Sequence, residues 1–149
     1  MKQNYRIALI IIALLFSVYQ SNSQCKSFAK EKAKTQLTPY IHDGNFNSMY
    51  FTEGEVAEMF KAFYSGQSYR MIIASDDNLP AVEFKILDSE RKVLFDNTEH
   101  KLVQKWDFKL ESSQQLIISI KVPVSKEHLD SPDNLDVGCV AVLFGFINN

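Results

Sequence analysis

The sequence lacks the short motifs that identify several large classes of enzyme. It contains no glycine-rich phosphate loop, no dinucleotide-binding fingerprint and no G-x-S-x-G nucleophile elbow. Serine is plentiful, but no serine stands in a sequence context that would activate it as a nucleophile. The sequence therefore gives no support to nucleotide-dependent chemistry or to a serine hydrolase, and it nominates no catalytic residue.

Cysteine is scarce and histidine is scattered. The two cysteines, Cys25 and Cys139, form no C-x-x-C pair that would lower a thiol pKa. The three histidines are His42, His100 and His128, and none has a His, Cys or carboxylate partner at the short spacings of a zinc site. We interpret all three histidines as surface residues, so the sequence predicts no metal site built on them.

An excess of positive charge is also missing. The chain has 16 Lys and Arg against 18 Asp and Glu, and its formal net charge is −2. Binding to nucleic acid favours a basic face, and this balance gives no electrostatic reason to expect one. We therefore predict no nucleic-acid partner.

The hydrophobic run near the N-terminus is too short to cross a membrane. Ile7–Tyr19 would rise about 20 Å as a helix, which is less than the roughly 30 Å hydrocarbon core. Two basic residues precede this run, and two serines follow it at the −3 and −1 positions of a cut after Ser23. This pattern predicts a secretory signal peptide over residues 1–23.

Removal of this segment would leave a single domain over residues 24–149, with no membrane span and a formal net charge of −4. Two other interpretations stay open: a membrane anchor that is retained, and a lipoprotein modified at Cys25. Asn22 and Gln24 stand where a lipid-attachment site has a leucine-like and a small residue. The main prediction is an exported bacterial protein, located in the periplasm, on the cell surface or outside the cell.

Export places both cysteines in an oxidising compartment, where an even count predicts a disulfide between Cys25 and Cys139. The bond would close a loop of more than 100 residues and stabilise the fold by about 4–5 kcal/mol in the chain-entropy model. The alternative is two unpaired buried thiols that behave as small hydrophobic side chains.

The most informative part of the sequence is Ala81–Val122, where apolar and polar residues alternate between turns. Val82, Phe84 and Ile86 share one face, and the same period recurs around Trp106 and Phe108. Alternation of this kind predicts antiparallel strands with one buried and one solvated face. We expect Trp106 and Phe108 to lie in the core.

The remaining segments complete a sandwich. Gln24–Gln36 is predicted to be a helix whose apolar stripe lies against the sheets, and this side consists of Cys25, Phe28, Ala29, Ala33 and Gln36. Glu55–Tyr64 fits either a helix or a strand, and we favour a strand. Val137–Ile147 is apolar on both faces, which is typical of a strand covered on both sides. We predict an all-β, antiparallel, jelly-roll-like sandwich of about eight strands within residues 48–147, with one short N-terminal helix.

Three segments carry a family resemblance: GQSYRMII from Gly66, VEFKILDSERKVLFDN from Val82 and KWDFKLESSQQLIISIKV from Lys105. Together, over about residues 49–146, they resemble the prepeptidase C-terminal domains of secreted bacterial proteins and GOLD-type jelly rolls. They are also similar to small exported bacterial proteins without an assigned activity. Ser89-Glu90-Arg91 stands where the family has a glycine turn. The resemblance implies a non-catalytic accessory or binding module.

Two loops are candidate calcium sites, because calcium prefers hard oxygen ligands and exported jelly rolls often bind it between loops. Neither loop matches the EF-hand pattern, and solvated turns are the simpler interpretation. The aromatic residues could instead line a carbohydrate or protein groove, although alternating aromatics are usually core residues. The calcium candidates are Asp76, Asp77, Asp130, Asp133 and Asp136, and the aromatics considered are Phe51, Phe60, Phe63, Tyr64, Tyr69 and Trp106.

Three functions are compatible with these observations. The first is a non-catalytic exported module that binds a protein or a glycan, with no cofactor. The second is a secreted hydrolase with carboxylates gathered in a groove, and the third is a structural or assembly subunit. No pair of carboxylates is nominated by the sequence, because such pairs assemble only in three dimensions.

Overall fold

A computed structural model describes residues 21–148 of the chain. Most of the predicted signal peptide, residues 1–20, lies outside the described residues, so cleavage after Ser23 stays a prediction. Within the described part, no helix combines the length and apolar character that a membrane crossing needs.

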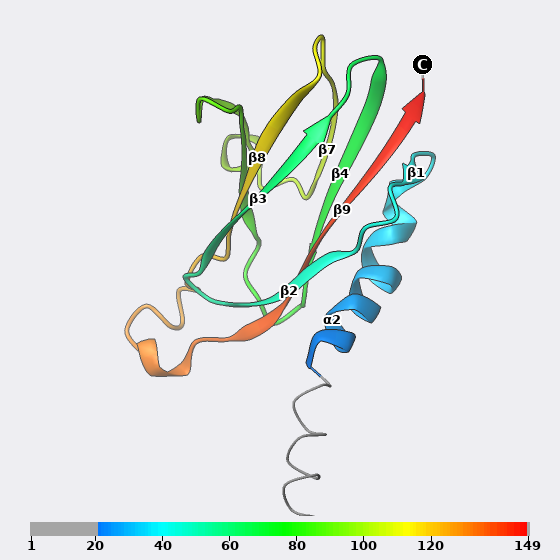
Figure 1. Cartoon of the computed structure of the whole chain (residues 1–149). Helices are drawn as coiled ribbons and strands as arrows, with labels where there is room; N and C mark the ends of the chain where they lie inside the picture. The colour runs from blue at the N-terminus through cyan, green and yellow to red at the C-terminus, as the bar shows by residue number, and fades with distance from the viewer. Residues whose placement is uncertain (1–20, 149) are drawn as a thin grey trace, which may run out of the picture.

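The nine strands of the described chain form two antiparallel sheets that lie face to face (Figure 1). Sheet A has the order β2-β9-β4-β7, with the short β1 beside the far end of β9, and sheet B has the order β3-β8-β5-β6. Without β1, these are the two sheets of a jelly roll. The bounds are β1 Ile41–His42, β2 Asn47–Thr52, β3 Val56–Phe63, β4 Gln67–Ser75, β5 Glu83–Leu87, β6 Val93–Asp96, β7 Lys105–Lys109, β8 Gln114–Lys121 and β9 Val137–Asn148.

The predicted all-β, jelly-roll-like sandwich is therefore confirmed, with one strand more than expected. The additional strand is β1, which lies before residues 48–147, where we predicted the strands, and pairs with β9 at only two positions. Glu55–Tyr64, the ambiguous segment, is the strand β3. The main core lies between the sheets and contains Phe51, Phe63, Met71, Phe84, Leu116 and Phe144 among its buried residues.

Trp106 and Phe108 lie at the rim of this core, and our expectation that they would be central is wrong. Both side chains are half-buried and pack against the buried residues from outside. Among the described strands, β7 pairs only with β4 and forms an edge of sheet A, so part of each side chain remains in contact with solvent. The two rings stack with centroids 4.3 Å apart, and Phe95 of β6 continues the stack at 4.9 Å from Trp106.

The predicted N-terminal helix is present and covers the outer face of sheet A (Figure 1). It consists of α2, Ser21–Phe28, a π-helical turn, Ala29–Ala33, and a 3-10 turn, Lys34–Leu37. Ala29, Ala33 and Leu37 pack against Ile72, Ala141 and Leu143, which form a second buried cluster.

The buried stripe of this helical segment differs from the predicted stripe at its C-terminal end. We placed Gln36 on the apolar side, but Gln36 is exposed and Leu37 is buried. The hydrogen bonds of a π turn span one residue more than those of an α-helix. Because of this extra residue, the buried position at the end of the segment is Leu37 and not Gln36. The buried residues are then four positions apart: Cys25, Ala29, Ala33 and Leu37.

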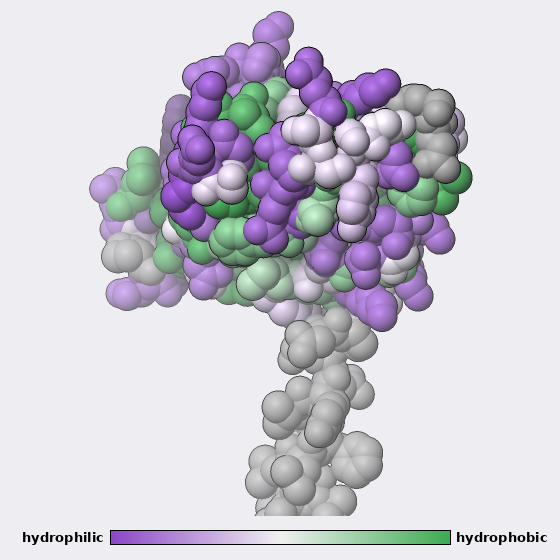
Figure 2. All heavy atoms as spheres, turned by 45° about the horizontal axis from the view of Figure 1, so that its top comes forward, coloured by the Kyte–Doolittle hydropathy of each residue, from purple (hydrophilic) through white to green (hydrophobic). Residues whose placement is uncertain are grey.

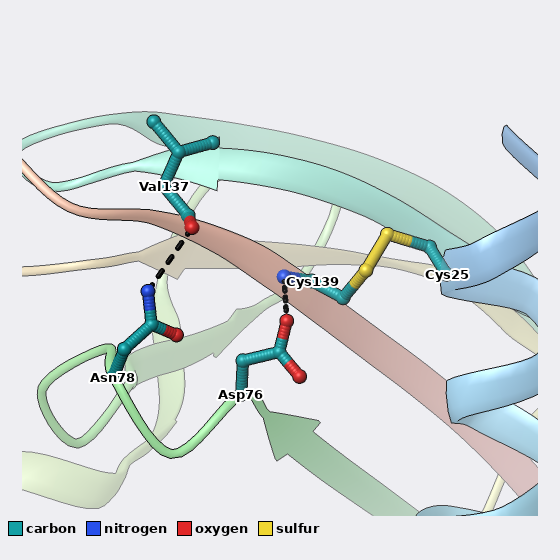
Figure 3. The surroundings of a disulfide bond; sticks show 5 residues. All are labelled: Cys25, Asp76, Asn78, Val137 and Cys139. Atoms are coloured by element: carbon teal, nitrogen blue, oxygen red, sulfur yellow. Dashed lines mark hydrogen bonds between the residues drawn. A yellow bond between two sulfur atoms is a disulfide. The ribbon is translucent and has the colours of Figure 1, made fainter. Parts of the chain in front are cut away.

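A disulfide and the loop that follows β4, residues 76–80, stabilise the region where the helical segment meets β9 (Figure 3). Cys25 of α2 and Cys139 of β9 are joined, with their Cα atoms 5.4 Å apart, as the sequence predicted. On the other side of β9, the Asp76 carboxylate accepts a hydrogen bond of 2.8 Å from the Cys139 amide, and the Asn78 amide donates one of 3.1 Å to the Val137 carbonyl. The loop thus lies directly on β9.

Arg70 of β4 anchors the C-terminal end of the helical segment. Its guanidinium donates two hydrogen bonds, of 2.7 and 2.6 Å, to Asp107 of β7 and one of 2.8 Å to the Thr38 carbonyl. It also lies 4.5 Å from the centre of the Tyr40 ring. The hydrogen bonds from Arg70 lower the pKa of Asp107, so this pair stays charged.

Candidate functional site

A groove opens between the two sheets along the side where β2 and β3 face each other. It has a volume of about 270 Å³, and its walls include Phe51, Met49 and Met59. Inward-facing residues of both strands line it because neither strand has a further partner on that side among residues 21–148. Methionine side chains are flexible and polarisable, and they are common on surfaces that accept apolar ligands.

A second hollow of about 250 Å³ lies farther along β3 and is lined by Lys61, Asp43, Tyr69 and Phe144. Lys61 points inward from β3, and its ammonium donates a hydrogen bond of 2.7 Å to the Asp43 carboxylate. The same ammonium lies 4.9 Å from the centre of the Phe144 ring. An inward-pointing charge on an edge strand opposes pairing with another strand, so Lys61 protects this edge from aggregation.

Three large exposed side chains lie on β3 or directly after its end. Val56, Phe60 and Tyr64 are 59%, 57% and 63% exposed and repeat at intervals of four residues along the chain. Because the side chains of a strand alternate, Val56 and Phe60 project on the solvent side of sheet B. Tyr64 directly follows the last residue of β3 and also borders the second hollow. We define Val56, Phe60 and Tyr64 as the sheet B patch.

The exposure of the sheet B patch corrects part of the sequence interpretation. Phe60 and Tyr64 were expected in the core, and they are exposed. Phe51, Phe63 and Tyr69 are buried as expected, whereas Trp106 is only half-buried. Alternation did not show which face of β3 is buried, because both faces carry apolar residues. Ala57, Met59 and Phe63 occupy the inner face.

Phe60 also begins an apolar row that crosses sheet B. It lies opposite Ile117 of β8, which in turn lies opposite Leu87 of β5, and Leu87 pairs with Val93 of β6. Figure 2 shows one end of the molecule, where hydrophobic side chains reach the surface between hydrophilic ones.

A separate cluster of charged residues lies at the end of the sandwich where two connections between the sheets meet. Glu53 is in the turn from β2 to β3, and His128 and Asp136 are in the loop from β8 to β9. Glu53 is only 2% exposed, and its Oε2 atom lies 2.7 Å from His128 Nδ1. One potential ligand atom from each of Glu53, His128 and Asp136 lies within 4.8 Å of the others.

Hydrogen bonding between Glu53 and His128 favours the charged form of each side chain. Burial acts to raise the pKa of Glu53, but hydrogen bonds with His128 and Ser125 outweigh it and the pKa is lowered. The hydrogen bond to Glu53 raises the pKa of His128, with smaller contributions from the charges of Asp136 and Glu127. Glu53 Oε1 is buried and has no hydrogen-bond partner among the described residues.

This cluster is not arranged as a catalytic relay, although Ser125, His128 and Glu53 contact one another. In a Ser–His–carboxylate relay the hydroxyl and the carboxylate bind opposite nitrogens of the imidazole ring. Here Ser125 Oγ, at 3.1 Å, and Glu53 Oε2, at 2.7 Å, both approach Nδ1. The ring therefore cannot pass a proton from the serine to the glutamate in the manner of a triad.

Sequence reasoning did not find this cluster. His128 and Glu53 are 75 positions apart, so no local motif links them, and His128 was interpreted as a lone surface residue. The only signal was the acidic loop that contains Asp136. The disulfide, by contrast, was predicted and is formed.

The structure places the five calcium candidates in different surroundings. Asp76 is engaged with the Cys139 amide, and Asp77 forms an ion pair with Lys32 at 2.9 Å. Asp136 lies near Glu53 and His128. Asp130 and Asp133 are exposed, and neither belongs to a group of potential metal ligands in the described part of the chain. Calcium binding by these loops stays a prediction.

Comparison with known proteins shows the fold alone. No protein-family model matches the chain, and no curated protein matches it in sequence. A solved structure of similar fold is PliG from Aeromonas hydrophila, a periplasmic inhibitor of g-type lysozyme. The two are 10% identical with a TM-score of 0.50, over 73% of this chain and 89% of that chain. The β-sandwich is thus shared, whereas neither of the families that the sequence resembles is matched.

Proposed function

We propose that this protein is an exported, non-catalytic binding module whose partner is a protein. The observation that carries the proposal is the sheet B patch, Val56, Phe60 and Tyr64, beside the apolar groove between β2 and β3. Aromatic and aliphatic side chains with more than half of their surface in water are unusual when they gather on one strand. Burial of such a cluster against a partner is a common source of binding energy.

The two surfaces lie on the same edge strand and support the same function. Met49 of β2 and Met59 of β3 line the groove, Phe60 projects from the outer side of β3, and Tyr64 is exposed just after the end of the strand. A partner that covers this edge would bury both sets of side chains at once. We favour a protein over a glycan as the partner, because PliG, whose fold is similar, inhibits a protein, the g-type lysozyme.

The disulfide and the neighbour of similar fold support the compartment. Structural disulfides form in the periplasm or outside the cell and are rare in the cytosol. PliG is a periplasmic protein that inhibits an enzyme. A lysozyme of the g type is therefore the first partner to test, and the proposal itself concerns any envelope or extracellular protein.

Site-specific photo-crosslinking tests this proposal. A photoreactive phenylalanine analogue is placed at Phe60, and the protein is produced in the bacterium in which it naturally occurs. One dominant crosslinked protein should result. The matched control is the same analogue at Leu129, an apolar side chain that is 65% exposed and lies outside the patch. Equal crosslinking at both positions, or none at Phe60, would remove the sheet B patch as a protein-binding surface.

Binding to purified g-type lysozyme gives the narrower test. The wild-type chain should bind it and reduce its activity, and Phe60→Ser should weaken binding at least tenfold while Leu129→Ser has no effect. Binding that Phe60→Ser leaves unchanged would place the contact elsewhere. The absence of any binding would exclude this enzyme as the partner.

A further inference from the structure

Glu53, His128 and Asp136 have the composition of a transition-metal site. They offer one imidazole nitrogen and two carboxylates, and one ligand atom from each lies within 4.8 Å of the others. Zinc binds such ligands at about 2.0–2.2 Å, which separates them by about 3.3 Å in tetrahedral geometry. His128 and Asp136 both belong to the loop before β9, so small side-chain movements there would adjust the spacing. Glu53 Oε2 and His128 Nδ1, now 2.7 Å apart, would separate slightly to admit the ion.

Glu53 supplies a second, independent observation. Its side chain is completely buried, and its Oε1 atom has no hydrogen-bond partner among the described residues. A buried carboxylate oxygen without a partner is costly, because water solvates that oxygen in the unfolded chain. The buried pair with His128 satisfies only Oε2. A bound cation would provide the missing partner and compensate the second carboxylate, Asp136.

We propose that Glu53, His128 and Asp136 form a binding site for a divalent transition metal, with zinc as the expected ion. The nitrogen ligand favours zinc over calcium, which is held almost entirely by oxygen ligands. Three protein ligands leave a position for water or for a group from a partner. The site is independent of the sheet B patch and would persist if the proposed function were wrong.

The location indicates what a metal would do. Glu53 belongs to the turn that leads from sheet A to sheet B, and the loop with His128 and Asp136 returns the chain from sheet B to sheet A. The backbone already links the two connections, since the Glu53 amide donates a hydrogen bond of 3.0 Å to the Asp136 carbonyl. A metal would add a crosslink between the same two segments and hold the loop against the sandwich.

Zinc titration of the purified, disulfide-bonded chain tests the proposal. Isothermal titration calorimetry at pH 7.5 should show one zinc per chain, and zinc should raise the Tm relative to a sample with a chelator. Calcium at the same concentration should leave the Tm unchanged. Asp136→Asn and His128→Gln should each weaken zinc binding at least tenfold. An increase in Tm with calcium but not with zinc would overturn the proposal.

Two matched variants separate this site from adventitious binding. Asp133→Asn removes the same charge from the same loop at an exposed position, and His42→Gln removes a histidine whose Nε2 lies 3.9 Å from Asp43. Both should keep zinc affinity within twofold of the wild type. The proposal fails if the wild-type chain binds no zinc, if His42→Gln abolishes binding, or if Asp136→Asn leaves it intact. Should His128→Gln not fold, the half-buried Asp136 provides the decisive variant.

Discussion

The outer face of sheet A lies under a helical segment, whereas the outer face of sheet B is open to solvent. On sheet A, Ala29, Ala33 and Leu37 cover the central strands β4 and β9, and the disulfide fixes one end of the cover. On sheet B, surface ion pairs take the place of a cover. They are Lys85–Asp96 at 2.8 Å, Lys121–Glu83 at 3.0 Å and Arg91–Glu58 at 2.6 Å.

This contrast separates the stabilising part of the molecule from the part that is available for contacts. Surface ion pairs contribute about 0–1 kcal/mol each, whereas a buried leucine contributes several times more. We therefore expect changes on the covered face to affect stability and changes on the open face to affect binding. Four experiments, from the largest expected effect to the smallest, test this division.

Loss of the disulfide should have the largest effect. The double variant Cys25→Ala, Cys139→Ala removes a crosslink across 114 positions, for which the chain-entropy model gives about 4–5 kcal/mol. Urea unfolding measures the loss, and hydrogen exchange should accelerate in α2 and β9 more than in the β5–β6 hairpin. A loss below about 1 kcal/mol, or exchange that rises equally in both sheets, would contradict the assigned role of the cover.

The buried stripe of the helical segment comes next. Leu37→Ala should lower the free energy of unfolding by about 2–4 kcal/mol, because the leucine is fully buried against sheet A. Gln36→Ala is the adjacent control and should change it by less than about 0.5 kcal/mol, since Gln36 is exposed. The opposite order of effects would show that the π turn does not shift the buried side to Leu37.

An ion pair on the open face should matter less, and in a pH-dependent way. Burial acts to raise the pKa of Asp96, but hydrogen bonds from Lys85 and Thr98 outweigh it, so that the pKa falls below its ordinary 3.8. Asp96→Asn keeps a capping oxygen for Thr98 and removes the charge that pairs with Lys85. We expect a loss of about 1 kcal/mol at pH 7.

The sign of the pH effect follows from the lowered pKa of Asp96. The charged form stabilises the folded state above pH 3.8, and this contribution disappears as the pH falls through the folded-state pKa. The hydrogen bond with Asp96 raises the pKa of Lys85 above 10.5, so at high pH the ion pair is lost only in strong alkali. The stability difference between wild type and Asp96→Asn should therefore shrink as the pH falls below 3.8, and a difference that stays constant or grows on acidification would disprove the assignment.

The smallest effect on stability is expected in the sheet B patch. Phe60→Ser should change the free energy of unfolding by no more than about 0.5 kcal/mol, because the ring is already 57% exposed. Its effect should appear in partner binding, as described above. A loss comparable to that of Leu37→Ala would mean that Phe60 is a structural residue and would remove the contrast between the two faces.

The difference between the two faces was partly visible in the sequence. Val137–Ile147 is apolar at nearly every position, which indicates a strand covered on both sides, and it is the central strand β9. Val82, Phe84 and Ile86 alternate with charged residues, and they face the core from sheet B. The disulfide was predictable from the expected export and the even number of cysteines.

The remaining features required three-dimensional information. Both faces of β3 are apolar, so alternation alone could not distinguish Met59, which faces inward, from Phe60, which faces solvent. The half-exposure of Trp106 depends on β7 being an edge strand, which is a property of the topology. Glu53 and His128 meet only because two connections between the sheets end at the same place.

The position of β9 also affects the order in which the molecule can assemble. β9 is the ninth strand in chain order, yet it pairs with β1, β2 and β4 and covers twelve residues. A chain that is threaded through a membrane channel from its N-terminus therefore exposes three strands whose common partner arrives last. Pairing across such long sequence separations is slow. We expect the polypeptide to stay extended during transit and to become compact, and oxidised, only when its final segment has crossed.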